Sequence, residues 1–125
     1  MIYEEVKSFS NAVDRLKEGL EFEHSDFSIL FDGNTKRLQF NYSACLKALR
    51  AKLGLSRDIK DESALNKAFE GGIISNIDIW DRLRKDLDYI YNDYEEDENR
   101  KIYNRIGEYL GEYEYTLRQL RLSDS

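Results

Sequence analysis

The chain has 125 residues, and at the usual domain size of about 100–150 residues this length predicts one domain, 1–125, with the last few residues frayed. Hydrophobic residues make up 41% of the chain and charged residues 35%, a balance typical of a folded globular domain. The 25 acidic residues outnumber the 19 basic ones, and the net charge of -6 disfavours DNA and other nucleic acids as partners unless a local basic patch exists.

A single cysteine and a single histidine exclude further classes of protein. A zinc site usually needs about four Cys, His or carboxylate ligands, and a disulfide framework needs paired cysteines, so we expect no metal, no cofactor and no disulfide. Residues 1–7 contain two glutamates and no apolar run, and no stretch of about 18 apolar residues occurs. We therefore expect no signal peptide, no membrane association and a cytoplasmic location.

The absence of proline, together with many Leu, Lys, Glu and Arg residues, predicts an all-α fold, because nothing interrupts the helices. Apolar residues at alternating spacings of four and three predict a first helix from Tyr3 to Phe22. The residues that set this pattern are Ile2, Val6, Phe9, Val13, Leu16 and Leu20.

The stretch from His24 to Asn34 is predicted to be a connection, because the sequence Asp32-Gly33-Asn34 is typical of a turn. A second helix is then expected from Thr35 to Leu53, with Gly54 at the position of a C-terminal cap glycine. This helix carries the apolar stripe Leu38, Tyr42, Cys45, Leu46, Leu49 and Leu53.

The pattern between Ala64 and Phe69 predicts a short helix, which the pair Gly71 and Gly72 closes. It follows a polar connection and is expected to be a satellite of the main bundle.

A fourth helix is predicted from Asn76 to Tyr91, because Ser75 and Asp78 have capping-box spacing and apolar residues follow at helical intervals. The acidic run 93–98 precedes a last helix, whose apolar positions extend from Ile102 to Leu120. Four long amphipathic helices and a short one predict an up-and-down four-helix bundle with one additional short helix.

Few residues in the chain carry catalytic chemistry. His24 lies among acidic residues at an expected helix end, and we interpret it as a solvated or capping histidine. Cys45 lies on an apolar stripe, which favours a small core residue over a reactive thiol. The acidic run lacks calcium-loop spacing and its glycine, so we interpret it as a solvated helix start rather than a metal site.

Tyrosines are concentrated in the last two predicted helices. They are Tyr89, Tyr91, Tyr94, Tyr103, Tyr109, Tyr113 and Tyr115. These side chains cannot all face one core, so we expect some to line a groove or an interface, and we expect a homodimer. The alternative is that most pack with their hydroxyl groups at the wet rim of the bundle.

Several segments match a known family in order and spacing. They are 36–42 (KRLQFNY), 47–49 (KAL), 68–74 (AFEGGII), Trp80 and 102–106 (IYNRI). From about Val6 to Leu120 the chain resembles the nucleotidyltransferase substrate-binding protein family, a branch of the HEPN superfamily of helical bundles. The resemblance implies a dimeric bundle that associates with a separate minimal nucleotidyltransferase, often as a toxin and antitoxin pair.

Many HEPN proteins cut RNA with an Arg, four to six intervening residues and a His, followed in this branch by one residue and then a Tyr. In the alignment implied by the resemblance, these positions fall on Leu87, Asn92 and Tyr94. An asparagine cannot exchange a proton near pH 7, whereas a histidine can. The resemblance therefore implies a non-catalytic subunit; the alternatives are a ribonuclease toxin with a diverged site and a plain dimerisation bundle.

The candidate ligand and partner site lies near the start of the last predicted helix and comprises Trp80, Arg84, Asn92 and Tyr94. Arg84 is expected to pair with the phosphate of a nucleotide ligand. The resemblance implies that Tyr94 is a position at which a partner nucleotidyltransferase attaches nucleotide. The neighbouring acidic run would steer a basic partner, and Tyr94 or Trp80 would supply the buried anchor.

Overall fold

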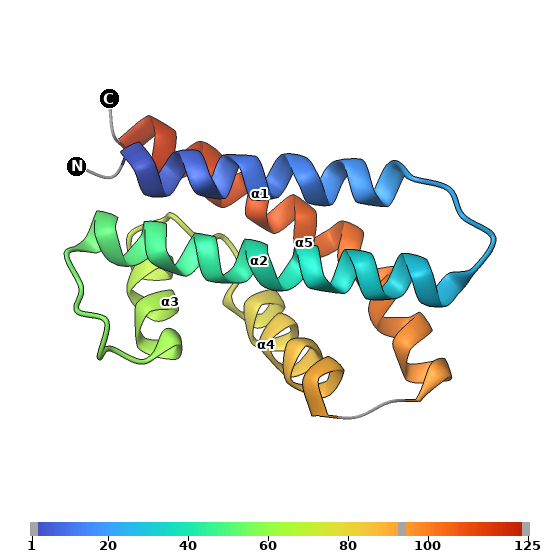
Figure 1. Cartoon of the computed structure of the whole chain (residues 1–125). Coiled ribbons are helices and arrows are strands. Elements are labelled where there is room, and N and C mark those ends of the chain that lie inside the picture. Colours follow the sequence, from blue (N-terminus) through green and yellow to red (C-terminus); the bar gives the residue numbers. More distant parts are fainter. Residues whose placement is uncertain (1–2, 93–94, 124–125) are drawn as a thin grey trace.

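The computed structural model describes residues 3–92 and 95–123, which form five helices and, in that part of the chain, no strand (Figure 1). The helices are α1 (Tyr3–Glu21), α2 (Phe27–Leu53), α3 (Asp61–Glu70), α4 (Ile77–Asn92) and α5 (Glu96–Ser123). α1 begins and α5 ends at the same end of the bundle (Figure 1). The prediction of an all-α bundle of four long helices with one short helix is confirmed.

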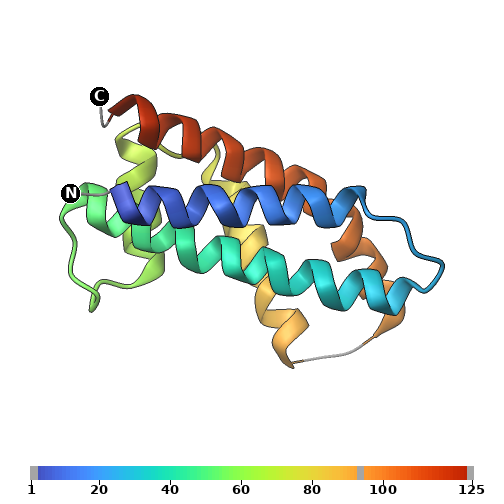
Figure 2. The ribbon, with the colours of Figure 1, turned by 45° about the horizontal axis from the view of Figure 1, so that its top comes forward.

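The helices do not pack equally. In both ribbon views α1 lies alongside α2, α5 packs against this pair, and α4 is inclined to α2 (Figures 1 and 2). The short α3 packs against α2 and α4 near one end of the bundle. No helix in residues 3–92 and 95–123 is long and apolar enough to cross a membrane.

Aromatic side chains occupy the centre of the core. The rings of Trp80 and Tyr113 meet edge to face with centroids 5.4 Å apart, and Phe9 meets Tyr113 in the same way at 6.0 Å. The Tyr113 hydroxyl donates a hydrogen bond to the Leu38 carbonyl oxygen at 3.2 Å, so this buried phenol has a partner. Cys45 is fully buried, as predicted, and burial raises the pKa of its thiol well above the usual value.

The predicted connection between the first two long helices is wrong in its second half. α2 begins at Phe27, where the Asp26 side chain accepts a hydrogen bond from the Ser28 N–H (2.9 Å) as the N-cap. The sequence Asp32-Gly33-Asn34 therefore lies inside a helix. Tertiary contacts override its turn preference: Asn34 is buried, and its amide donates to the carbonyl oxygen of Gly19 (3.1 Å) and the hydroxyl of Tyr103 (2.9 Å).

The other helix ends agree more closely with the sequence. Gly54 closes α2 in the left-handed conformation (φ 65°), as predicted. The capping-box prediction for Ser75 is wrong, because the Asn76 side chain accepts the N–H groups of Asp78 (3.1 Å) and Ile79 (3.3 Å) at the start of α4. His24 is exposed beyond α1, and its Nδ1 accepts the Asp26 N–H at 2.9 Å.

Two glycines provide a matched test of this description. Gly111 lies in the interior of α5 with open space around the position of a Cβ, so Gly111→Ala should raise the free energy of unfolding by about 0.5–1 kcal/mol. Gly54→Ala should lower it by about 1 kcal/mol or more, because Gly54 has a positive φ. Urea denaturation followed by circular dichroism measures both. A stabilising Gly54→Ala would contradict the left-handed C-cap.

Candidate functional site

A groove of about 500 Å³ lies between α2 and α4, with α3 at its edge. We call it the α2–α4 groove, and its lining residues are Gln39, Tyr42, Ser43, Asp61, Arg84, Leu87, Asp88 and Tyr91. The Tyr91 side chain is 83% exposed, which leaves a large aromatic surface at the rim. The groove therefore combines one free aromatic side chain with charges of both signs.

Asp61 has fixed partners on one wall of the groove. Arg50 Nη2 donates to Asp61 Oδ1 at 2.6 Å and to the Ile59 carbonyl oxygen at 2.7 Å. The Tyr42 hydroxyl donates to Asp61 Oδ2 at 3.1 Å. Burial, and then the charge of Asp61, raise the pKa of Tyr42 far above its usual value. Tyr42 is therefore a neutral hydrogen-bonding group at physiological pH, and it is not available as a base.

Arg84 has only a loose partner. Its nearest carboxylate is that of Asp81, one turn earlier on α4, with 3.8 Å between Arg84 Nη1 and Asp81 Oδ1. The guanidinium also borders a second hollow, of about 490 Å³, which is lined by Glu62, Asp81, Lys85 and Asp88 as well as Arg84. Four carboxylates and two cations thus surround the two hollows, so the surface around Arg84 is acidic on balance.

The structure brings together only part of the predicted site. Trp80 is fully buried in the core, so the prediction that its ring lies in a surface groove is wrong. Asn92 is exposed at the end of α4, where its amide donates to the carbonyl oxygen (2.9 Å) and Oδ1 (3.1 Å) of Asp88. Tyr94 lies outside the described residues. Arg84 lines the groove together with Tyr91, which the sequence placed among the clustered tyrosines but not in the candidate site, and with Asp88, which the sequence did not single out.

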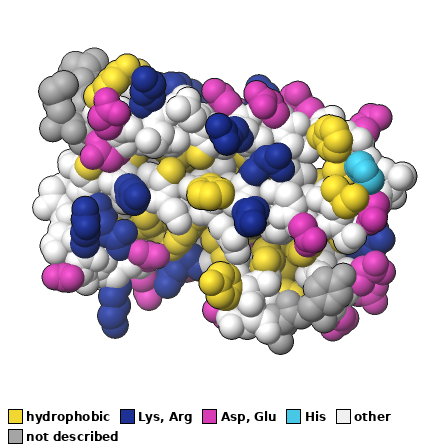
Figure 3. Space-filling model, in the orientation of Figure 1, with side chains coloured by type: hydrophobic (Ala, Val, Ile, Leu, Met, Phe, Trp, Pro, Cys, Tyr) yellow, Lys and Arg dark blue, Asp and Glu magenta, His cyan; other side chains and the backbone are white. Residues whose placement is uncertain are grey.

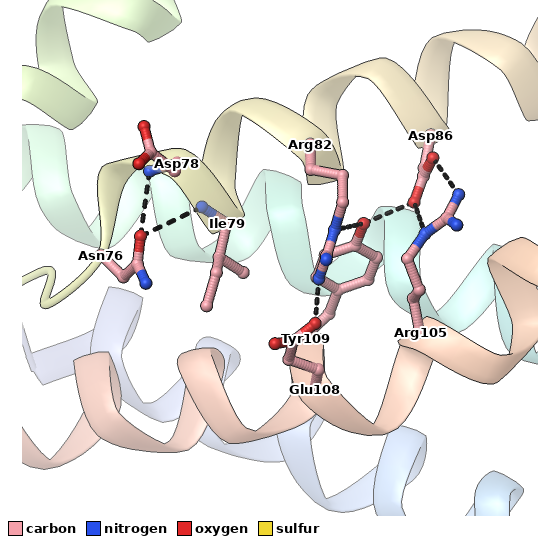
Figure 4. A network of polar contacts seen from close by, with 8 residues as sticks. All are labelled: Asn76, Asp78, Ile79, Arg82, Asp86, Arg105, Glu108 and Tyr109. Atoms are coloured by element: carbon pink, nitrogen blue, oxygen red, sulfur yellow. Dashed lines mark hydrogen bonds and ion pairs between the residues drawn. The ribbon is translucent and has the colours of Figure 1, made fainter.

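A network of charged side chains fixes α4 to α5 next to this groove (Figure 4). Asp86 on α4 is 7% exposed, and Arg105 on α5 binds it with two hydrogen bonds, Nε to Oδ2 (2.8 Å) and Nη2 to Oδ1 (2.7 Å). The Tyr109 hydroxyl donates to the same carboxylate, and Arg82 Nε donates to the Tyr109 hydroxyl at 3.0 Å. Arg82 also pairs with Glu108 and stacks over the Tyr109 ring, 5.2 Å from its centroid.

These contacts favour a structural role for the network rather than a catalytic one. Burial, and then the hydrogen bond to Asp86, raise the pKa of Tyr109 to about 12. The hydrogen bond with Asp86 also raises the pKa of Arg105. Every charged group in the network is occupied by another, so the network holds two helices together and offers no free proton donor or acceptor to a substrate.

Metal ligands are not grouped in the described part of the chain. Within residues 3–92 and 95–123, no cluster of three or more His, Cys, Asp or Glu side chains is arranged to hold a metal ion.

Comparisons with known proteins agree with this fold. A family model described as nucleotidyltransferase substrate binding protein like matches residues 4–122. The chain is also similar to the solved structure of HI0074 from Haemophilus influenzae, which is described as revealing the fold of a substrate-binding domain of a nucleotidyltransferase. That likeness has 20% sequence identity and a TM-score of 0.80, and it covers 93% of this chain and 98% of HI0074. A comparison with curated protein sequences gave no match.

The Asp86 network predicts an unequal response to the loss of two arginines on α5. Arg105→Ala should lower the free energy of unfolding by about 2–4 kcal/mol, because it leaves a buried carboxylate without its cation. Arg118→Ala should change it by less than about 0.5 kcal/mol, because Arg118 is an exposed residue on the same helix. Urea denaturation at pH 7 compares them. Equal effects would contradict the structural role of the network.

Proposed function

Because this chain belongs to the nucleotidyltransferase substrate binding protein like family, we propose that it is a non-catalytic helical subunit that binds a separate minimal nucleotidyltransferase and presents substrate to it. The observation that carries this proposal is the family match, which covers residues 4–122 of the 125-residue chain. The proposal includes the toxin and antitoxin pairing and the nucleotide ligand that the resemblance implies.

The residues at the ribonuclease positions support a non-catalytic role. Leu87 has no charge to bind a phosphate, and the Asn92 amide is occupied by the backbone and side chain of Asp88. His24 is held in a local contact with the Asp26 N–H, on the connection between α1 and α2. RNA cleavage by general acid–base chemistry needs a group that exchanges protons near pH 7, and neither Leu87 nor Asn92 is one.

The acidic balance of the α2–α4 groove favours a protein partner over a phosphate group at this site. Arg50 already compensates the charge of Asp61, but Glu62, Asp81 and Asp88 also lie around Arg84, and these three carboxylates would repel an anionic ligand. A basic surface on the nucleotidyltransferase would fit these charges, and Tyr91 at the rim would supply the aromatic anchor. We therefore assign the contact with the nucleotidyltransferase to the α2–α4 groove and, as the family resemblance implies, to Tyr94.

A homodimer also belongs to this proposal. Of the clustered tyrosines, Tyr109 and Tyr113 are in the core, so a second chain would contact other exposed apolar side chains, such as Phe22 and Ile29. Sedimentation of the isolated protein tests the dimer, since a single species of 14.8 kDa at micromolar concentration would exclude it.

Substitution of exposed tyrosines tests the assignment of the partner surface. Tyr91→Ala and Tyr94→Ala should each weaken binding of the partner nucleotidyltransferase by roughly 2 kcal/mol, about 30-fold, because an aromatic anchor is lost. The matched control is Tyr3→Ala, since Tyr3 is 58% exposed and lies on α1, away from the groove. Calorimetric titration measures all three variants.

An acidic side chain of the run 93–98 should behave differently from the aromatic anchors. Glu95→Ala should change the affinity only slightly and should reduce its dependence on salt, because a rim charge mainly steers association. Unchanged affinity for both tyrosine variants would move the partner surface away from the α2–α4 groove. Absence of any complex with the nucleotidyltransferase would overturn the proposed function itself.

A further inference from the structure

A second groove, on the other side of α2, has the opposite charge. It lies between α1 and α2, has a volume of about 550 Å³, and has no carboxylate among its lining residues. We call it the α1–α2 groove, and its cations are Arg15 of α1 and Lys36 and Arg37 of α2. In Figure 3, dark-blue Lys and Arg side chains gather over α1 and α2 around a yellow side chain in the middle of the face. This is the local basic patch that the sequence composition alone does not reveal.

These three cations are available to a ligand. In the part of the chain that the structure describes, none of them forms an ion pair, although other arginines do. Arg37 donates one long hydrogen bond, from Nη1 to Asn34 Oδ1 at 3.5 Å. All three are exposed and line one groove, which has no carboxylate among its lining residues. A bound anion would relieve this repulsion.

Two glycines lie close to Arg37. A Cβ at Gly33 would lie 2.9 Å from Arg37 Nη1, whereas a Cβ at Gly19 would first meet Asn34 Oδ1 at 2.1 Å and then Arg37 Cδ at 3.1 Å. A glycine inside a helix costs about 1 kcal/mol relative to alanine, and Gly33 lies well inside α2. Gly33 and Arg37 both line the groove, and the guanidinium of Arg37 lies over the position that a Cβ of residue 33 would take.

An exposed aromatic ring completes the groove. Phe40 is 66% exposed and lies one helical turn after Lys36 and Arg37 on α2. A phenyl ring left in water among cations is unfavourable by itself, but it can stack on a flat heterocycle, and the neighbouring cations can bind the phosphates attached to it.

From this juxtaposition we infer that the α1–α2 groove is a binding site for a nucleoside phosphate. Arg15, Lys36 and Arg37 bind the phosphates, and Phe40 stacks on the base. The volume of about 550 Å³ lies within the usual range of about 300–1,000 Å³ for small-molecule sites. The inference rests on the proposed function, since it gives the nucleotide ligand of that proposal a site, on a different side of α2 from the partner surface.

The charge of the whole chain favours a mononucleotide over RNA. A long polyanion would leave the three cations and pass over other parts of a protein with a net charge of -6, including the carboxylates beside Arg84. A mononucleotide needs only the local patch.

Calorimetric titration of the full chain with ATP, adenosine and tripolyphosphate tests the inference, and each variant removes one type of contact. Arg37→Gln should weaken both ATP and tripolyphosphate by about tenfold, because it removes a charged donor to phosphate. Phe40→Ala should weaken ATP by at least about fivefold and leave tripolyphosphate within about twofold, because only ATP has a base to stack. Arg118→Gln is the matched control and should leave both within about twofold.

Three results would overturn the inference: no binding of ATP at millimolar concentration, equal affinities for ATP in all variants, or tighter binding of a single-stranded oligoadenylate than of ATP at the same salt concentration. Lys36→Gln also removes a cation that binds phosphate, and it should weaken ATP and tripolyphosphate as Arg37→Gln does. Because Lys36 is exposed and has no ion pair, this variant keeps the test valid even if Arg37→Gln fails to fold. The experiment uses no nucleotidyltransferase. If the chain binds ATP but forms no complex with the nucleotidyltransferase, the nucleotide site stands and the proposed function is overturned. If it forms the complex but does not bind ATP, the proposed function stands and this inference is overturned.

Discussion

The buried carboxylate of Asp86 is the constraint on which the arrangement of the last two long helices depends. A charge at 7% exposure is costly unless it is paired, and here Arg105 and Tyr109 of α5 both bind it. The same helix α4 places Trp80 in the core and Arg84 and Tyr91 on the groove. The Asp86 network fixes the position of α4 relative to α5, both around and along the α4 axis. The network therefore helps to set which α4 side chains face the core and which line the groove.

α2 organises the rest of the molecule, because both grooves are built on it. One side of α2 faces α3 and α4 across an acidic groove, and the other side faces α1 across a basic one. Asn34 joins α2 to the end of α1 through the Gly19 carbonyl oxygen and to α5 through the Tyr103 hydroxyl. Two surfaces of opposite charge on one helix suit a subunit that binds a protein on one side and a phosphorylated substrate on the other.

Periodicity along the chain was sufficient to predict the helices, since each long helix buries one regular apolar stripe. It failed where the deciding contact comes from another helix. Asn34 has the composition of a turn residue, and only its partners on α1 and α5 explain why it lies inside α2. The sequence predicted Trp80 as an aromatic anchor in a groove, because aromatic residues occur both in cores and at interfaces. Its contact with Tyr113, which places it in the core, cannot be inferred from the sequence alone.

The candidate site was harder to predict than the fold for the same reason. Arg84 was found because the family resemblance directed attention to its neighbourhood, whereas Tyr91 and Asp88 join it only through the packing of α4 on α2. The pairs Arg82 with Asp86 and Arg105 with Tyr109 each have the i, i+4 spacing that places side chains on one helix face, and this was the available signal for the network. Which two faces meet is a property of the fold, so that signal could not be interpreted from the sequence alone.

The central claim is that α4 and the adjoining side of α2 form the surface for a nucleotidyltransferase. Amide hydrogen exchange of this chain, measured with and without the proposed minimal nucleotidyltransferase partner, tests that claim most directly. The account predicts slower exchange on complex formation in α4 and in residues 39–43 of α2, with little change in α1. Slower exchange confined to α1 and the C-terminal half of α5, or none at saturating partner, would contradict it.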